Sequence, residues 1–205
     1  MKKRSKLEEI AIGVLTLATA TLAGGFIYHS GSKDFFMDDN QASIYKEEMP
    51  AQKEISYKTA NFSIDSDTIL LARMIFGEAR GCSNLEKVAV AYTAINRAND
   101  GKKWNGEILK EVILKRWQYS CFNKNDINRK KIEDPERYDS KSWKICLKIA
   151  EDVLSKKVKD PTPGATHYFN SKLVSSYPDW ANKLTKVGKI QTETGLSEHE
   201  FYIEY

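Results

Sequence analysis

Apolar residues recur at the three- and four-residue spacing of an α-helix in four stretches of this chain. The first stretch begins at a polar cap within residues 65–67 and ends at glycines within residues 77–81. The second opens at Ser83, which forms the S-x-x-E pattern of a capping box with Glu86, and it ends near residues 99–101. The pattern therefore predicts two helices joined by a short turn.

A third helix is predicted over residues 107–116, and the polar stretch 117–139 that follows it has no helical period. Connections of this length inside compact domains are often functional. A fourth helix begins at Asp139 or Ser140 and closes before Pro161. The inward face of the second helix is expected to carry Leu85, Val88, Ala89, Tyr92 and Ile95. That of the third should carry Ile108, Leu109, Val112 and Ile113. That of the fourth should carry Trp143, Cys146, Ile149, Ala150, Val153 and Leu154.

The chain after Pro161 is rich in turns and short strand-forming runs, with Gly188 and Gly195 as breakers. We interpret this part as loops and a small antiparallel sheet. Helices followed by short strands along one chain indicate an α+β, mainly helical domain. The folded part is expected to span residues 62–205, which is the length of one ordinary domain with a single core.

Residues 1–28 have the charge pattern of a membrane-inserting segment, because basic residues precede an uncharged, mostly apolar run over residues 10–28. At about 1.5 Å rise per residue the run is just long enough to cross a hydrocarbon core of about 30 Å. The segment is therefore an uncleaved signal anchor or a cleaved signal peptide, and a buried helix of a cytosolic protein is the less favoured alternative. The basic end stays in the cytoplasm, so the rest is expected on the extracytoplasmic face of the membrane, or in the cell wall after cleavage.

Residues 29–61 combine scattered charge with apolar residues of no clear period, and we interpret them as a flexible linker or stalk. The formal net charge of the whole chain is +4, and four basic against two acidic residues among the first nine supply half of it. The small remainder gives no support for a nucleic-acid partner.

All three cysteines fall in the part that is expected outside the membrane, where disulfides persist. Cys121 with Cys146 is the preferred pairing, which would leave Cys82 as a free thiol. The sequence contains no C-x-x-C motif and no cysteine–histidine cluster at metal-ligand spacing. We therefore expect no thiolate-based zinc site and no cofactor.

Glu78 is the strongest candidate for chemistry, because it ends the first apolar helix in the stretch LARMIFGEARG over residues 71–81. A carboxylic acid works as a general acid near neutral pH when its surroundings raise its pKa, and an apolar helix end beside a cleft can do so by desolvation. The alternative is a solvated glutamate that pairs with Arg80 or Arg73. The local sequence alone leaves both interpretations open.

Five separated motifs follow one another along the folded part. They are FGEARG at residues 76–81, AVAYTAINR at 89–97, WQYSCFNKNDINR at 117–129, PTPGATHYFN at 161–170 and EHEFY at 198–202. Over about residues 67–202 the chain thereby resembles the SleB-like spore cortex-lytic and cell-wall hydrolase family. The resemblance implies a lysozyme-like, goose-type catalytic domain that cleaves the β-1,4 bond between N-acetylmuramic acid and N-acetylglucosamine in peptidoglycan, with Glu78 as the catalyst.

Members of this kind are described as lytic transglycosylases, in which one acid protonates the leaving oxygen and later takes a proton from the muramic C6 hydroxyl as it attacks C1. This chemistry needs one carboxyl group, and no second carboxylate at the spacing of about 5–9.5 Å that ordinary glycosidases use. Asp126 and Glu86 are the candidates for a second carboxylate. A solvent-facing or capping role is the simpler interpretation of each.

The same resemblance places further residues beside the sugar chain. The matching motifs contain Gln118, Tyr119 and Ser120, followed by His167, Tyr168 and Asn170. Their amides, hydroxyls and aromatic faces suit neutral sugars, although a helix-ending turn with a buried tyrosine is the alternative for the first motif. Trp180 is the tryptophan expected in the cleft, since Trp143 falls on a predicted core face.

The leading hypothesis is therefore a monomeric, membrane-tethered peptidoglycan lytic transglycosylase whose partners are glycan strands. A peptidoglycan amidase with a metal ion held by His167 and His199 is one alternative, and a non-catalytic wall-binding module is another. Cys82 departs from the family pattern, because it stands where members commonly carry another glutamate. The sequence does not distinguish the vegetative wall from spore cortex as the substrate.

Overall fold

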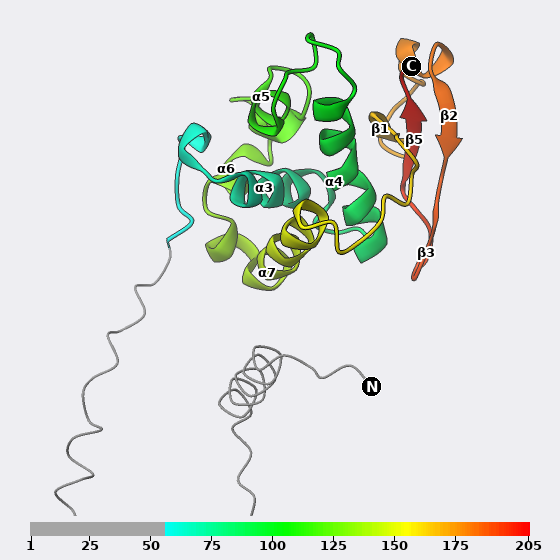
Figure 1. Ribbon diagram of the computed structural model, residues 1–205. Helices are drawn as coiled ribbons and strands as arrows, with labels where there is room; N and C mark the ends of the chain where they lie inside the picture. The colour runs from blue at the N-terminus through cyan, green and yellow to red at the C-terminus, as the bar shows by residue number, and fades with distance from the viewer. Residues whose placement is uncertain (1–55) are drawn as a thin grey trace, which may run out of the picture. The chain divides into compact units, whose positions relative to one another are not determined.

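A computed structural model describes residues 56–205 of the chain (Figure 1). The expected membrane segment over residues 1–28 and nearly all of the expected linker lie outside the described residues. Among residues 56–205, no helix has the length and apolar character needed to cross a membrane. The described residues belong to one compact unit with its own hydrophobic core, so we expect a fragment of residues 54–205 to fold on its own.

Helices come first and short strands last along the described residues. The α-helices are α3 (Asp67–Ala79), α4 (Asn84–Asn99), α5 (Leu109–Leu114), α6 (Arg129–Glu133) and α7 (Pro135–Leu154), and the 3₁₀ helices are η1 (Phe62–Ile64), η2 (Ser120–Phe122) and η3 (Asp179–Asn182). The strands are β1 (His167–Asn170), β2 (Thr185–Gly188), β3 (Gln191–Thr192), β4 (Gly195–Leu196) and β5 (His199–Ile203). The predicted α+β, mainly helical class is confirmed.

Helix α3 is the centre of the helical part, where it packs against α4, α5, α6 and α7 (Figure 1). Its N-terminus is capped by Ser66, whose side chain accepts a hydrogen bond from the Ile69 backbone N–H at 3.3 Å, as the sequence predicted. Every residue from Leu70 to Gly77 is buried. Burial of each large apolar side chain contributes about 1.5–3 kcal/mol, so the best-packed part of the fold lies directly before Glu78.

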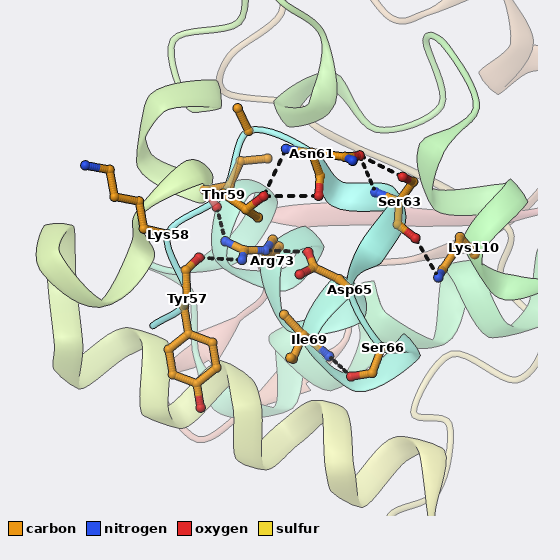
Figure 2. Close-up of polar contacts among 12 residues, drawn as sticks. Tyr57, Lys58, Thr59, Asn61, Ser63, Asp65, Ser66, Ile69, Arg73 and Lys110 are labelled. Carbon is orange, nitrogen blue, oxygen red and sulfur yellow. Dashed lines mark hydrogen bonds and ion pairs between the residues drawn. The ribbon is translucent and has the colours of Figure 1, made fainter. Parts of the chain in front are cut away.

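Arg73 joins α3 to the chain that precedes it (Figure 2). Its Nε donates to Oδ2 of Asp65 at 2.7 Å, and its Nη2 donates to the Tyr57 carbonyl at 2.5 Å. Thr59 extends the attachment by donating its backbone N–H to a carbonyl of α6 at 2.9 Å. The folded part therefore begins by Tyr57, earlier than the predicted boundary at Phe62, because the buried guanidinium needs acceptors from this segment.

The middle of the chain is more structured than the sequence predicted. Ile108, which was expected to face inward, is 57% exposed because it precedes the first turn of the shortened helix α5. The polar connection after α5 contains η2 and α6. Helix α7 begins at Pro135 but is non-helical at Asp139, whose Oδ1 accepts the Ser142 backbone N–H at 3.0 Å. The predicted helix start corresponds to this internal cap.

The three-stranded sheet has the order β1-β5-β2 with antiparallel neighbours, and it lies beside α4 (Figure 1). In the register of β1 and β5, Asn170 lies opposite His199. Successive residues of a strand point to opposite faces. Accordingly, Tyr168 packs against the main core, whereas Phe169 belongs to a small separate cluster on the other face. Strand β1 thereby presents Tyr168 to the helices.

Candidate active site

The end of α3 approaches the η2 turn closely, and this approach places Glu78. A Cβ atom at Gly77 would lie 2.5 Å from Cβ of Cys121 and 2.6 Å from its Sγ. Contacts this short are not tolerated between packed side chains, so the position requires glycine. Glu78 is the next residue, and its side chain leaves the helix end beside the η2 backbone.

Both carboxylate oxygens of Glu78 accept a hydrogen bond. Oε1 accepts from the Cys121 backbone N–H at 3.1 Å, and Oε2 accepts from the Tyr168 hydroxyl at 3.1 Å. The donors come from η2 and β1, so elements far apart in the sequence fix this carboxylate. Arg73 and Arg80 donate to other partners, and Glu78 forms no ion pair within residues 56–205. The alternative interpretation, in which Glu78 forms a surface ion pair with Arg80 or Arg73, is therefore wrong.

One partly buried and one buried tyrosine lie around this carboxylate. Burial and the neighbouring negative charge of Glu78 raise the pKa of Tyr168 well above its usual range, so its hydroxyl stays protonated and remains a donor. Tyr119 is only 1% exposed, and burial also raises its pKa. Its hydroxyl lies 3.3 Å from Oγ1 of Thr93. The structure thus places Tyr119 beneath the site, which matches the buried-tyrosine alternative.

Arg97 is a further charged group of the site that sequence reasoning missed. Its guanidinium lies 5.3 Å from the centroid of the Tyr119 ring, and its charge also bears on the pKa values of Tyr168 and His167. Arg97 is buried, and its Nε and Nη1 have no hydrogen-bond partner among the residues that the structure describes. The motif AVAYTAINR contains this arginine, but its local spacing gave no sign that the side chain lies against Tyr119.

A pocket of about 870 Å³ runs along the segment that supplies the Cys121 amide. Ser120, which was expected to bind substrate, lines this pocket together with Asp126 and residues of the loop after η2. Asp126 uses its Oδ1 to accept the Asn128 backbone N–H at 2.7 Å. Burial raises the pKa of the Cys121 thiol well above its usual range, and the negative charges of Glu78 and Asp126 both add to this effect.

Trp117 stands at the wall of this pocket in a strained conformation. Its φ is 74°, in the left-handed region that bulky residues rarely adopt, and its side chain is 72% exposed. The next residue, Gln118, turns inward and donates its Nε2 to the Asn105 carbonyl at 3.2 Å. Strain of this kind persists where the surrounding structure enforces it, often at functional surfaces. Trp117 therefore adds an exposed aromatic face that the sequence did not single out.

The other expected sugar-binding residues lie on both faces of β1. The ring of His167 lies 5.2 Å from that of Trp180, on the face opposite to Tyr168. Burial lowers the pKa of His167 to about 4, so its imidazole is neutral near pH 7. Asn170 shares the face of Tyr168, and its Nδ2 donates to Glu198 at 3.2 Å. The structure therefore brings Tyr168, but neither His167 nor Trp180, into contact with Glu78.

Glu86 has a different role from the one expected. The serine half of the predicted capping box is confirmed, since Oγ of Ser83 accepts the Glu86 backbone N–H at 3.2 Å. The buried Glu86 carboxylate instead receives two hydrogen bonds of 2.8 Å at Oε1, from the backbone N–H and from Nδ1 of His199. Burial favours a raised pKa of Glu86, but the hydrogen bonds from His199 outweigh it and lower that pKa. The solvent-facing interpretation of Glu86 was wrong.

The expected disulfide and the alternative metal pair are not formed. All three cysteines are free thiols, so the predicted bond between Cys121 and Cys146 is wrong. Cys121 packs against Gly77 at the end of α3, whereas Cys146 is buried on α7, where burial raises its pKa to about 12. His167 and His199 also have different partners, on Trp180 and Glu86 respectively.

One family model and two solved structures resemble this chain. A family model described as Cell Wall Hydrolase matches residues 81–194, more than half of the chain, and this stretch contains η2 and β1. The catalytic domain of the germination-specific lytic transglycosylase SleB from Bacillus anthracis is 23% identical, with a TM-score of 0.44 over 66% of this chain and 93% of that one. The catalytic domain of the Bacillus cereus SleB protein is 23% identical, with a TM-score of 0.46 over 66% of this chain and 88% of that one. No curated protein matches the chain.

Proposed function

Because this chain belongs to the cell wall hydrolase family, we propose that it cleaves peptidoglycan glycan strands as a lytic transglycosylase with Glu78 as its single acid and base. The observation that carries this proposal is the environment of Glu78. Its two oxygens are held by uncharged donors, the Cys121 amide and the Tyr168 hydroxyl. A single positioned carboxyl group fits a mechanism in which one group gives and then takes a proton.

The proposed reaction returns Glu78 to its starting state without consuming water. The protonated carboxyl first gives its proton to the glycosidic oxygen as the bond from that oxygen to muramic C1 breaks. The carboxylate then accepts the proton of the muramic C6 hydroxyl while the C6 oxygen forms a bond to C1. The product is a 1,6-anhydro end. Tyr168 and the Cys121 amide orient the carboxylate and stabilise its charge between the two proton transfers.

The pocket beside η2 supplies a place for the sugar chain. Its volume of about 870 Å³ falls within the range of roughly 300–1,000 Å³ that is typical of small-molecule sites. Ser120, Asn123, Asn125 and Trp117 are among its lining residues, and side chains of these types suit the hydroxyls and apolar faces of sugars. The lining also contains four charged residues, Lys115, Arg116, Lys124 and Asp126. We assign the glycan to this pocket rather than to the surface around Trp180.

The proposal is tested by the mass of the fragments released from purified peptidoglycan. Residues 54–205 and the Glu78→Gln variant are incubated with the polymer, and soluble products are analysed by mass spectrometry. Anhydromuramic ends that are absent with the variant are the expected result. Reducing ends, one water heavier, would mean hydrolysis and would direct attention to Asp126 as a second carboxylate.

Two other outcomes would favour the alternative functions. Stem peptides released from intact glycan would identify an amidase. Binding of glycan by both proteins without release of any fragment would identify a wall-binding module. The mass of the products distinguishes these functions, so the test does not depend on whether a chelator inhibits a metal-dependent amidase.

We also propose that the enzyme acts on the extracytoplasmic face of the membrane, held there by residues 1–28. The support is the order of basic residues and apolar run in the sequence. Fractionation of cells that produce the full chain is the test. Retention in the membrane fraction after an alkaline wash indicates an uncleaved anchor, whereas a shortened soluble product indicates cleavage.

A further inference from the structure

A thiol, a carboxylate and an imidazole meet between the start of α4 and the start of β5. The donor atoms of Cys82, Glu86 and His199 all lie within 4.8 Å of one another. Nδ1 of His199 and Oε1 of Glu86 are 2.8 Å apart. Glu86 and His199 are buried and Cys82 is half-buried, so the cluster is enclosed on one side and accessible through the thiol. This cluster is separate from the groups that hold Glu78.

We propose that Cys82, Glu86 and His199 bind a divalent transition-metal ion of the Zn²⁺ class. Thiolate sulfur, carboxylate oxygen and imidazole nitrogen are the ligands that zinc takes in proteins. Zinc bonds of about 2.0–2.3 Å place tetrahedral donors roughly 3–4 Å apart. The three ligand atoms, which lie within 4.8 Å of one another, would move closer together around a bound ion. Three protein ligands leave a fourth position for water.

The charges at this cluster suit a dication. Burial and the negative charges of Glu86 and Glu198 raise the pKa of the Cys82 thiol to about 12 in the ion-free protein. An entering dication would displace the thiol proton, and the resulting thiolate and the Glu86 carboxylate would together neutralise two positive charges. Lys87 is the nearby cation, but its ammonium group donates to the backbone carbonyl of Cys82. On binding, the thiol proton passes to solvent and the imidazole proton moves from Nδ1 to Nε2, so one proton is released for each ion bound.

The backbone already holds two of the ligands in place. The His199 backbone N–H donates to Oε1 of Glu86 at 2.8 Å, and this bond does not involve the ring nitrogen that would bind the metal. Such supporting hydrogen bonds commonly orient metal ligands. The hydrogen bond between Glu86 and the His199 ring holds the same two residues together without an ion. An entering ion would replace this hydrogen bond, because the metal takes the place of the proton between Nδ1 and Oε1.

A metal ion at this position would stiffen the strand pair that reaches Glu78. The ring of Tyr168 contacts the His199 ring edge-on with centroids 5.0 Å apart, and the hydroxyl of Tyr168 donates to Glu78. The ion would bind no sugar and take no part in proton transfer. Cys82, Glu86 and His199 are thus positioning residues for β1, and the ion fastens β5 to the start of α4.

Cobalt(II) is the probe that tests this site, because a thiolate bound to cobalt gives a charge-transfer absorption that carboxylate and imidazole ligands do not give. The fragment of residues 54–205 is treated with chelator and a non-thiol reductant, then titrated with Co²⁺. We expect saturation at one ion per chain, a thiolate-to-cobalt band, and loss of that band when Zn²⁺ is added. The Cys82→Ser variant should lack the band, whereas Cys146→Ala should keep it.

Thermal unfolding supplies a second readout that needs no variant. Zn²⁺ at about 100 times its dissociation constant should raise the Tm of the unsubstituted fragment by roughly 5 °C. The shift should be absent in His199→Gln and retained in His167→Gln. An unsubstituted fragment without a thiolate band and without a shift in Tm overturns the proposal, as does a band of equal strength in a folded Cys82→Ser protein.

The metal proposal and the catalytic proposal can each be refuted without refuting the other. Chelated protein should still release anhydromuramic products, at a reduced rate if the ion positions Tyr168. Metal binding without glycan cleavage would leave the site intact and remove the proposed function. Glycan cleavage by a protein that binds no metal would refute the metal site and leave the proposed function intact.

Discussion

Glu78 and Glu86 lie on consecutive helices, and each accepts one backbone N–H and one side-chain hydrogen bond, yet their surroundings differ. Glu78 is only partly buried, accepts a hydrogen bond from the η2 backbone between two pocket-lining residues, Ser120 and Phe122, and has a tyrosine hydroxyl as its side-chain donor. Glu86 is 2% exposed and has an imidazole as its donor. A carboxylate that substrate can reach is able to exchange protons with it, whereas an enclosed one can only hold its neighbours together.

The comparison predicts that the same substitution has opposite consequences at the two positions. Glu78→Gln should lower the rate of glycan cleavage by about 100- to 10,000-fold, because general acid–base catalysis contributes that much. Its Tm should change little, since an amide oxygen still accepts one of the two hydrogen bonds. Product release is followed by mass spectrometry and unfolding by circular dichroism. Unchanged cleavage by the variant would remove Glu78 from the mechanism.

Glu86→Gln should instead lower the stability of the domain. Hydrogen bonds to a charged group contribute about 1.5–3 kcal/mol, so we expect the free energy of unfolding to fall by about 2 kcal/mol in urea. The rate of cleavage by the folded variant should fall by less than about tenfold. A large loss of activity without a loss of stability would mean that Glu86 also takes part in the chemistry.

At acid pH, the unsubstituted protein and the Glu86→Gln variant should have the same free energy of unfolding. The pKa of Glu86 is lowered in the folded state from its usual value of 4.5. The stabilisation is therefore fully present above pH 4.5 and is lost as the pH falls through the folded-state pKa. Urea unfolding at several pH values should give a constant difference above about pH 5 that shrinks below pH 4. If the two free energies of unfolding still differ at pH 2, the loss of stability in Glu86→Gln comes from packing and not from the charge of Glu86.

The position of Glu78 was predictable from local sequence, whereas that of Glu86 was not. The helix carrying Glu78, its cap at Ser66 and its end near Gly77 follow from residues close in the chain, which local patterns describe well. The partner of Glu86 is His199, 113 residues away. The local pattern S-x-x-E is the same whether the glutamate caps the helix or is buried against a distant histidine. The sequence therefore favoured the capping role.

Long-range packing also explains the other differences. The pairing of Cys121 with Cys146 was chosen because both cysteines were expected outside the membrane, but Cys121 fills the space left by Gly77. The start of the domain at Tyr57 depends on Arg73, whose partners cannot be read from its neighbours in sequence (Figure 2). The sequence pointed to Trp180 as the cleft tryptophan, and the exposure of Trp117 could not be read from it because exposure is a property of the folded chain.

Tyr168→Phe sharpens the comparison by removing one donor from Glu78 while keeping the ring. The Oε2 atom then lacks its partner, and the carboxylate is less well oriented and less stabilised. We expect cleavage to slow by about tenfold, which corresponds to about 1.4 kcal/mol, with only a small fall in Tm. The products should still carry anhydro ends. A change from anhydro to reducing ends would show that Tyr168 excludes water rather than orienting the acid.

The smallest effect on cleavage is expected at the two tryptophans, whose substitutions should shift Tm in opposite directions. Trp117→Gly relieves a residue with φ of 74° and removes an exposed ring from the pocket wall. Strain of this kind costs about 1 kcal/mol or more, so Tm should rise slightly while KM for glycan increases a few-fold. Trp180→Ala removes a ring that packs against Phe169 at 5.7 Å, so Tm should fall while KM stays unchanged. If Trp180→Ala alone raises KM, the glycan follows the other face of β1 and the assignment of the pocket beside η2 is wrong.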